Sequence, residues 1–459
     1  MTHAHENQAI IAQCTPSGSG ALALLRISGT DAITLTAYFS RLASGIPMAQ
    51  VPTHTIAYGT IHDTHHNPID HVLFLVMYGP KTFTGQDTVE ITCHNNPFII
   101  EAIISRAIEH GARLAGNGEF TRRAVLNNKI DLLQAEAIHE LIQANTQQVL
   151  KKSLAQLDGS FSHQIDIIEK NLVTTIALAQ ASFEFLDEEQ LEFGPDILKN
   201  VEAVCISIQK LKKNFNQQQQ IRQGIRIAII GSVNAGKSSL FNALIGTARA
   251  IVSPIAGTTR DVIEAGLYKN GNYWTLVDTA GLRHAQDTIE QEGIRRSFEQ
   301  AHLADVIILA CDISRVMSAE ERQVYQCLVA QYQHKIVIVH TKIDLPSQAD
   351  CGAFGPAIAF SSTTGHGLET VHTALETKIA SLLQQADAPF LLNKRQYHLL
   401  IELEKGLMAT MPLLHKPHIP FELVAHHVTQ ALSHITELTG KSICESAMDA
   451  VFREFCVGK

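Results

Sequence analysis

The sequence predicts a multidomain protein in which an α/β domain of the P-loop type is inserted in an all-α helical domain, with an α+β domain before both. Three observations predict this arrangement. The string GSVNAGKS at residues 231–238 fits a phosphate-binding loop and follows the apolar, strand-like run 225–230. Helical periodicity both precedes and follows this unit, and short β-like runs occupy the first part of the chain. A chain of 459 residues is long enough for about three domains.

The composition is that of an ordinary soluble protein, with 45 % hydrophobic and 18 % charged residues. The net charge of −9 gives no global basic field, so any contact with nucleic acid must be local. Eight cysteines without a C-x-x-C pair argue against a zinc site and a disulfide framework. The polar start lacks an apolar signal core, and the apolar runs are too short to span a bilayer. We therefore expect a cytoplasmic protein with no membrane partner.

The first domain is predicted over residues 1–122 as an α+β unit. Strand-like runs at residues 21–27, 71–77 and 88–92 alternate with turns, and residues 97–110 have a helical pattern.

After the first domain the sequence has a helical pattern, which predicts the first part of a helical domain over residues 123–222. From Asp131 the capping pattern D-L-L-Q begins a long helix, and the helical pattern continues to about residue 215. The apolar positions that recur at helical spacing are Leu133, Ala137, Ile138, Leu141 and Ile142.

The P-loop unit is predicted over residues 223–382, and the second part of the helical domain over residues 383–459. One helix of this last part carries an apolar stripe that must be buried, formed by Leu423, Val424, Val428, Leu432, Ile435 and Leu438. We expect the helices before and after the P-loop unit to pack together, because a domain is tolerated as an insertion in a surface loop.

The P-loop residues have chemical roles that follow from their types. The glycines let backbone N–H groups surround the phosphates, Lys237 brings a positive charge to the outer phosphates, and the hydroxyl of Ser238 can ligate Mg²⁺.

Four further strings stand after the P-loop in the order found in GTPases. Thr258 and Thr259 lie in a switch-like segment, and the second can supply a hydroxyl to Mg²⁺. DTAG at residues 278–281 and TKID at residues 341–344 each follow an apolar run, and Asp344 can accept two hydrogen bonds from guanine that adenine cannot donate. SSTTG at residues 361–365 can close over the base.

These strings predict a GTP site of 23 residues that share backbone or side-chain contact with the nucleotide. They are Asn234, Ala235, Gly236, Lys237, Ser238, Ser239, Ser253, Pro254, Ile255, Ala256, Gly257, Thr258, Thr259, Asp278, Thr279, Ala280, Gly281, Thr341, Lys342, Asp344, Ser361, Ser362 and Thr363. Thr341 departs from the usual N-K-x-D pattern, since it replaces an amide that normally helps to hold the base. The alternative is that the strings are ordinary turns between strands and helices.

With these motifs in hand, the chain resembles the MnmE (TrmE) family of tRNA modification GTPases over nearly its full length. Outside the P-loop unit the resemblance rests on TPSGSG, LLRISG, FTGQD, GEFTRRAVLNNKIDLLQAEAI, FLDEEQLEF and the ending FCVGK.

The resemblance implies that the first domain binds 5-formyl- or methylene-tetrahydrofolate and pairs with its copy in a homodimer. The positions that match the folate contacts are Arg26, Glu90, Lys129 and Lys459. A carboxylate can hold the N–H edge of the pterin, and Arg or Lys can pair with the ligand's carboxylates. The alternative is that each is an ion-pair residue. Departures at Ala21, Asn95 and Asn96 add side chains beside the pocket.

The resemblance also implies a hydrolysis mechanism. Leu282 follows DTAG where many small GTPases have a water-positioning glutamine, and Glu290 matches the glutamate that serves in this family. K⁺ would be held by Asn234, Ser253, Ile255 and Thr258, and would act as an arginine finger does. Asn234 could instead merely cap the loop, and Glu290 could be a solvated helix-starting carboxylate.

The implied function is installation of an aminomethyl or carboxymethylaminomethyl group at C5 of the wobble uridine of tRNA, driven by GTP hydrolysis. The implied partner is the flavin-dependent MnmG (GidA), in a heterotetramer or larger complex. Cys456 matches a cysteine associated with the modification chemistry, although a cysteine near a terminus can be inert. The alternatives are a regulatory or ribosome-assembly GTPase and a folate-dependent methyltransferase carrying a GTPase insertion. The histidine pairs His62/His66 and His426/His427 are expected to be solvated or packing residues and not metal ligands.

Overall fold

The computed structural model describes residues 8–18, 20–144, 146–184, 193–213, 215, 224–246, 263–269, 272–278, 295, 298–348, 354–384, 390–442 and 445–458. The chain forms two compact units. The first combines Met1–His139, Ala155–Cys205 and Ile401–Lys459, and the second combines Glu140–Leu154 and Ile206–Leu400. None of the described helices is both long and apolar enough to cross a membrane.

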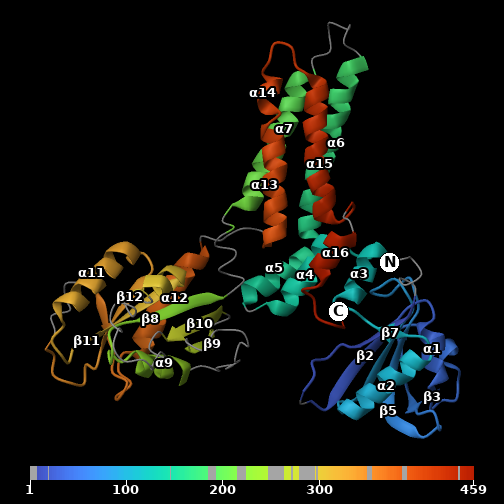
Figure 1. The fold of residues 1–459 in the computed structure, drawn as a ribbon, viewed down its shortest axis with the longest axis horizontal. Coiled ribbons are helices and arrows are strands. Elements are labelled where there is room, and N and C mark those ends of the chain that lie inside the picture. Colours follow the sequence, from blue (N-terminus) through green and yellow to red (C-terminus); the bar gives the residue numbers. More distant parts are fainter. Residues whose placement is uncertain are drawn as a thin grey trace. The chain divides into compact units, whose positions relative to one another are not determined.

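The first unit contains a seven-stranded sheet with the strand order β3-β4-β5-β6-β2-β1-β7 (Figure 1). The neighbouring strands are antiparallel, except that β1 and β7 are parallel. Its strands are β1 (Ile10–Gln13), β2 (Leu22–Ser28), β3 (Ser40–Leu42), β4 (Thr55–His62), β5 (Pro68–Met77), β6 (Thr88–His94) and β7 (Arg113–Leu114).

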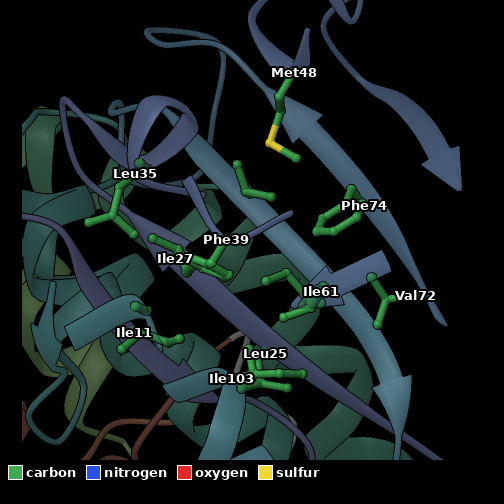
Figure 2. Close-up of a cluster of buried hydrophobic side chains, with 14 of the residues drawn as sticks. Ile11, Leu25, Ile27, Leu35, Phe39, Met48, Ile61, Val72, Phe74 and Ile103 are labelled. Carbon is green, nitrogen blue, oxygen red and sulfur yellow. The ribbon is translucent and has the colours of Figure 1, made fainter. Parts of the chain in front are cut away.

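One face of this sheet is buried under α1 (Ala32–Tyr38) and α2 (Pro97–Glu109). Successive side chains of a strand point to opposite faces, so alternate residues such as Leu25 and Ile27 enter the core. Figure 2 shows this core, where side chains from β2, β4 and β5 meet those of both helices. The predicted strands and the helix at residues 97–110 are all present with small shifts of their ends.

The other face of the sheet is covered at one edge and open elsewhere. Helix α3 (Glu119–Leu126) places Phe120 against Ile10 and Ala12 of β1. Farther along, Ile56, Tyr58 and Leu73 are 64 %, 53 % and 43 % exposed.

Helix α3 is held by an ion-pair cluster centred on Glu119. Arg113 donates to Glu119 Oε2 at 2.7 Å, and the buried Arg123 donates to Oε1 at 3.1 Å. Arg123 also donates to the backbone oxygen of Gln8 at 2.8 Å. Burial alone would raise the pKa of Glu119, but the hydrogen bond from Arg113 and both positive charges outweigh it and lower that pKa.

The helical residues form several separate helices, so the prediction of one long helix from Asp131 is wrong. The helices are α4 (Leu132–Gln143), α5 (Gln147–Leu157), α6 (Ser160–Glu184), α7 (Gly194–Lys212), α13 (Lys394–Met408), α14 (Met411–Leu414), α15 (Phe421–Thr439) and α16 (Glu445–Phe452). The capping box at Asp131 is present: its side chain accepts from Gln134 N at 2.8 Å, and Gln134 Oε1 accepts from Asp131 N at 3.0 Å.

Helices from before and after the P-loop unit pack on each other in the first unit. Helix α6 lies along α15, as Figure 1 also shows. The expected stripe on α15 is largely buried at Val424, Val428, Ile435 and Leu438, but Leu423 is 43 % exposed. Ile142 of α4 is likewise 46 % exposed. Apolar periodicity marks the buried face of a helix without fixing where its edge lies.

The second unit contains a six-stranded sheet with the order β13-β12-β11-β8-β10-β9, parallel except for β9. Its elements are β8 (Ile225–Ile230), α9 (Lys237–Gly246), β9 (Ile263–Lys269), β10 (Asn272–Asp278), β11 (Val306–Asp312), α11 (Ala319–Tyr332), β12 (Ile336–Thr341), β13 (Ala357–Ala359) and α12 (Leu368–Gln384).

Helices cover both faces of this second sheet. Helices α9 and α12 pack on one face through a core that includes Leu240 and Leu375, and α11 packs on the other through Tyr325 and Leu328. Such a parallel sheet places its ligand site at the carboxyl ends of its strands. The predicted strand-then-motif order therefore brings the motifs to one edge.

We expect Glu119→Gln to destabilise the first unit by about 2–4 kcal/mol, because it leaves the charge of buried Arg123 poorly compensated. Thermal unfolding of the whole chain, with hydrogen exchange in α3, measures the effect. Since the folded state lowers the pKa of Glu119, the difference from the unaltered chain is present at pH 7. It shrinks as the pH falls below the ordinary glutamate range and through the folded pKa.

The control is Glu109→Gln, which removes the half-exposed partner of Arg106 on α2. An exposed pair of this kind contributes about 0–1 kcal/mol. Equal losses in the two variants would contradict the role given to Glu119.

Candidate functional site

The loop between β8 and α9 makes a tight turn that its glycines and Asn234 allow. A Cβ atom on Gly231 would lie 2.5 Å from the backbone oxygen of Ala310, so no side chain fits there. Asn234 and Gly236 have φ angles of 61° and 83°, in the left-handed region. Asparagine tolerates this region better than most residues do, so Asn234 has a conformational reason to stand here.

Lys237 and Ser238 stand in the first turn of α9, where the predicted phosphate site lies. The ammonium group of Lys237 donates to the backbone oxygens of Gly231 and Ser232, at 2.8 and 2.6 Å. The Lys237 side chain is buried in this position, whereas Ser238 and Ser239 are exposed. A positive charge beside a helix N-terminus is suited to binding anionic phosphates.

A side-chain network outside the predicted motifs holds the start of this loop. Arg315 Nη2 donates to Ser232 Oγ at 2.7 Å and to both carboxylate oxygens of Glu321 at 2.9 Å. The hydroxyl of buried Tyr325 accepts from Ser232 N at 2.8 Å. The network thus fixes both the backbone and the side chain of Ser232. The sequence analysis did not predict this network. The only local sign of it in the sequence is the string DISR at residues 312–315, which begins at the end of β11.

The TKID string begins at the end of β12, beside the P-loop. Thr341 is 1 % exposed, and its hydroxyl lies 2.7 Å from the backbone oxygen of Ala235 and 3.2 Å from that of Cys311. Lys342 Nζ lies 2.7 Å from Asp312 Oδ2 at the end of β11. Burial would raise the pKa of Asp312, but hydrogen bonds from Lys342 and Ser314 outweigh this and lower it.

The structure brings the predicted guanine reader and the last motif together. The pKa of the exposed Asp344 is lowered, first by a side-chain hydrogen bond from Ser361 and to a smaller degree by Thr363. Ser361 Oγ also accepts from the backbone N of Thr363 at 3.2 Å, which shapes the loop. Ser362, between them, is exposed.

The DTAG string begins at the same edge of the sheet as the P-loop. Asp278 ends β10 and pairs with Ile229 of β8, so its backbone stands next to the start of the P-loop. The remaining predictions of this unit lie outside the described residues. They are Ser253, Pro254, Ile255, Ala256, Gly257, Thr258, Thr259, Thr279, Ala280, Gly281 and Glu290.

In the first unit, Arg26 and Glu90 are partners across β2 and β6. Arg26 Nε and Nη2 lie 2.8 and 2.7 Å from Glu90 Oε1, and the guanidinium carbon lies 5.5 Å from the centre of the Phe120 ring. Both side chains are less than one fifth exposed. They therefore form the ion pair that the alternative interpretation anticipated, on the open face of the sheet.

The C-terminal tail lies against the residues that precede α3 and against the end of β1. Val457 forms an antiparallel bridge with Asn117, and Gly118 N donates to the backbone oxygen of Cys456 at 3.3 Å. A Cβ on Gly458 would lie 2.5 Å from the backbone oxygen of Gln13, next to Ala12, the register partner of Arg26. Cys456 is exposed. Lys459 lies outside the described residues.

Lys129, another predicted folate contact, lies against a loop of the first unit. Its Nζ donates to the backbone oxygen of Pro80 at 2.8 Å, in the loop between β5 and β6. Lys129 Cδ lies 3.3 Å from the Cβ position of Gly85, so the lysine stem crosses this loop.

Two of the departures from the family pattern have structural roles. Asn95 Nδ2 donates to the backbone oxygen of Gly18 at 2.8 Å, which ties the TPSGSG loop to the end of β6. Asn96 caps α2 by accepting from Phe98 N at 2.9 Å. Ala21 is exposed.

The two histidine pairs make contacts of other kinds. Among the residues that the structure describes, no group of three or more His, Cys, Asp or Glu side chains could hold a metal ion. His62 Nε2 lies 3.2 Å from Thr60 Oγ1, and the rings of His426 and His427 contact each other.

A P-loop after β8, the start of DTAG after β10, TKID after β12 and SSTTG after β13 lie along one edge of a parallel sheet. This geometry defines a P-loop GTPase. The family described as the GTP-binding protein TrmE N-terminus matches residues 9–129, and the MnmE helical domain matches residues 132–456. The tRNA modification GTPase MnmE of Protochlamydia amoebophila is 36 % identical over 459 residues, 99 % of this chain and 98 % of that protein. The chain therefore belongs to the MnmE family of tRNA modification GTPases.

A second relative agrees with this assignment. The tRNA modification GTPase MnmE of Enterococcus faecalis is 35 % identical over 468 residues, covering 99 % of both chains. Among solved structures, the G domain of the T. maritima FeoB iron transporter covers 34 % of this chain and 98 % of its own, with 26 % identity and a TM-score of 0.27. The resemblance and the enzyme class predicted from the sequence are confirmed by the relatives.

We expect Glu321→Gln to weaken GDP binding by about three- to tenfold, because it removes the carboxylate that holds Arg315 on Ser232. Isothermal titration of the whole chain measures the affinity. The control is Glu320→Gln, an exposed neighbour in the same first turn of α11, which matches the loss of charge near the helix N-terminus. An equal loss in the control would contradict the role of Glu321.

Proposed function

We propose that this chain is a cytoplasmic, K⁺-dependent GTPase that acts with a flavin-dependent partner on tRNA. Together they install the aminomethyl or carboxymethylaminomethyl group at C5 of the wobble uridine. The observation that carries the proposal is a formed P-loop within a chain that matches MnmE proteins over 99 % of its length.

The nucleotide is proposed to bind along the carboxyl edge of the second sheet. The amides of residues 234–239 and the Lys237 charge face the phosphates, and Asp344 reads the guanine edge. Ser238 and Thr259 supply oxygen ligands to Mg²⁺, which neutralises charge on the phosphates. The exposed Ser238 hydroxyl at the start of α9 fits this role, since hard cations prefer oxygen donors.

The K⁺ site is proposed at the same loop, with Asn234, Ser253, Ile255 and Thr258 as ligands. Asn234 is exposed and stands at the turn, so its side-chain oxygen can reach a bound cation. The ion would supply positive charge to the transferring phosphoryl group. Glu290 is proposed to position the attacking water.

A tetrahydrofolate is proposed to bind on the open face of the first sheet. Arg26, Glu90 and Lys129 present charged groups there, with Lys459 at the end of the tail. The residues fit the ligand: within the described residues, Glu90 Oε2 has no hydrogen-bond partner, so it can accept from a pterin N–H edge. The folate, when bound, supplies the one-carbon unit, and Cys456 is proposed to take part in the modification chemistry.

Two arrangements complete the proposal. The chain is proposed to pair with a second copy through the open face, because exposed Ile56, Tyr58 and Leu73 form adjacent apolar positions on β4 and β5.

The P-loop domain is proposed to be an insertion in the helical domain. The packing of α6 on α15 supports this, since these helices lie on either side of it in the sequence. The flavin-dependent partner would join in a heterotetramer or larger complex.

We expect the whole chain to hydrolyse GTP at least about tenfold faster in K⁺ than in Na⁺. Asn234→Gly should bring this ratio close to one, because glycine accepts the backbone turn but offers no ligand. Asn234→Asp retains a side-chain oxygen and should keep the preference for K⁺. The measurement is the rate of phosphate release at saturating GTP.

A glycine variant that keeps the K⁺ preference would show that Asn234 serves the turn alone. A chain that hydrolyses GTP equally in both ions would contradict the K⁺ mechanism.

We expect Glu90→Gln to weaken binding of 5-formyltetrahydrofolate by about tenfold or more, because a charged hydrogen-bond acceptor is lost. With tRNA, GTP, K⁺, methylenetetrahydrofolate, an amine donor and the flavin-dependent partner, the variant should form little modified uridine, detected by mass spectrometry. GTP hydrolysis should be unchanged, and the exposed Glu101→Gln should behave as the unaltered chain.

A lower melting temperature without loss of folate binding would show that Glu90 is only the ion-pair partner of Arg26. Modified uridine formed without the flavin-dependent partner would contradict the proposed division of the reaction.

A further inference from the structure

Position 341 differs from the usual guanine-recognition pattern, and the structure shows what its side chain does. Thr341 ends β12 and is 1 % exposed. Its hydroxyl lies 2.7 Å from the backbone oxygen of Ala235, inside the P-loop, and 3.2 Å from that of Cys311 in β11. The side chain therefore connects two strands of the sheet to the loop that binds phosphate.

The chemistry of the hydroxyl leaves no second hydrogen bond for it to donate. A threonine hydroxyl has one proton, whereas an asparagine amide has two. Both oxygens near Thr341 Oγ1 are carbonyl acceptors, so the proton is committed to the protein backbone. No proton is left on this side chain to donate to a purine ring.

The P-loop is shaped to receive this contact. Ala235 is fully buried, and Gly236 turns with a φ of 83° directly beside Thr341. A Cβ on Gly236 would lie 3.4 Å from Thr341 Cβ, so the loop backbone packs on the threonine side chain. A buried carbonyl without its donor is costly, so loss of the hydroxyl should shift the loop.

We propose that Thr341 is a positioning residue for the P-loop and does not read the base. Phosphate affinity then depends on Thr341, and base selection by the TKID string depends on Asp344. This inference rests on the proposed guanine-reading role of Asp344. It gives Thr341 a different role from the nucleotide contact that the sequence predicted.

The test compares three diphosphates that differ only in the base: GDP, 7-deaza-GDP, which lacks the N7 acceptor, and IDP, which lacks the 2-amino group. Isothermal titration of the whole chain gives each affinity. We expect Thr341→Val, which keeps the β-branched shape, to weaken all three by the same factor of about ten. Thr341→Ser keeps the hydroxyl and should restore most of the affinity.

A loss in Thr341→Val that is larger for GDP than for 7-deaza-GDP would overturn the proposal, because it would show a contact with N7. No loss for any nucleotide would overturn it as well. Melting of the nucleotide-free variants checks that the fold is kept.

Thr341→Asn provides a second test that does not depend on the valine variant. The added amide N–H can reach the base while the side chain still anchors the loop, so GDP should gain over 7-deaza-GDP by about threefold or more. An unchanged ratio would overturn the proposal. Equal binding of GDP and IDP by the unaltered chain would contradict the Asp344 assignment alone, since Thr341 is judged on GDP and 7-deaza-GDP, which both carry the 2-amino group.

Discussion

The tight turn between β8 and α9 is the constraint on which the nucleotide site depends. Gly231 lies too close to the backbone oxygen of Ala310 for any side chain, and the next turns need left-handed backbone at two positions. The loop keeps this shape because neighbouring strands and α11 hold it. Ser232 is fixed by Arg315 and Tyr325. The shape of the loop therefore depends on the packing of β11, β12 and α11 around β8.

In the first unit, too, residues far apart in the sequence hold the structure together, because the end of the chain packs on the first domain. Val457 pairs with Asn117, and Gly458 packs on the end of β1. The tail reaches this position because α16 packs through Phe452 against α4. Residues more than 300 positions apart in the sequence are thus in contact. Since loop-closure entropy grows only slowly with length, a long intervening segment does not prevent this contact.

The sequence predicted those features that depend on residues close together in the chain. The P-loop string, the capping box at Asp131 and the strand before each GTPase motif follow from local spacing. The breaks between the helices after Asp131 and the exposed edge at Leu423 depend on which neighbours cover a face, so periodicity could not give them. The network of Arg315 with Glu321 depends on α11 folding back over the loop, and no local string records that approach.

The division between backbone and side-chain recognition explains why so few residues carry specificity here. Phosphates are bound mainly by backbone N–H groups, so the side chains of the P-loop are free for other contacts. Ser232 uses that freedom to bind Arg315. The proposed recognition of the base on the TKID string, in contrast, depends on a single side chain. Because the Thr341 hydroxyl is committed to Ala235, our proposal leaves the separation of guanine from other bases to the carboxylate of Asp344, which accepts a hydrogen bond from Ser361.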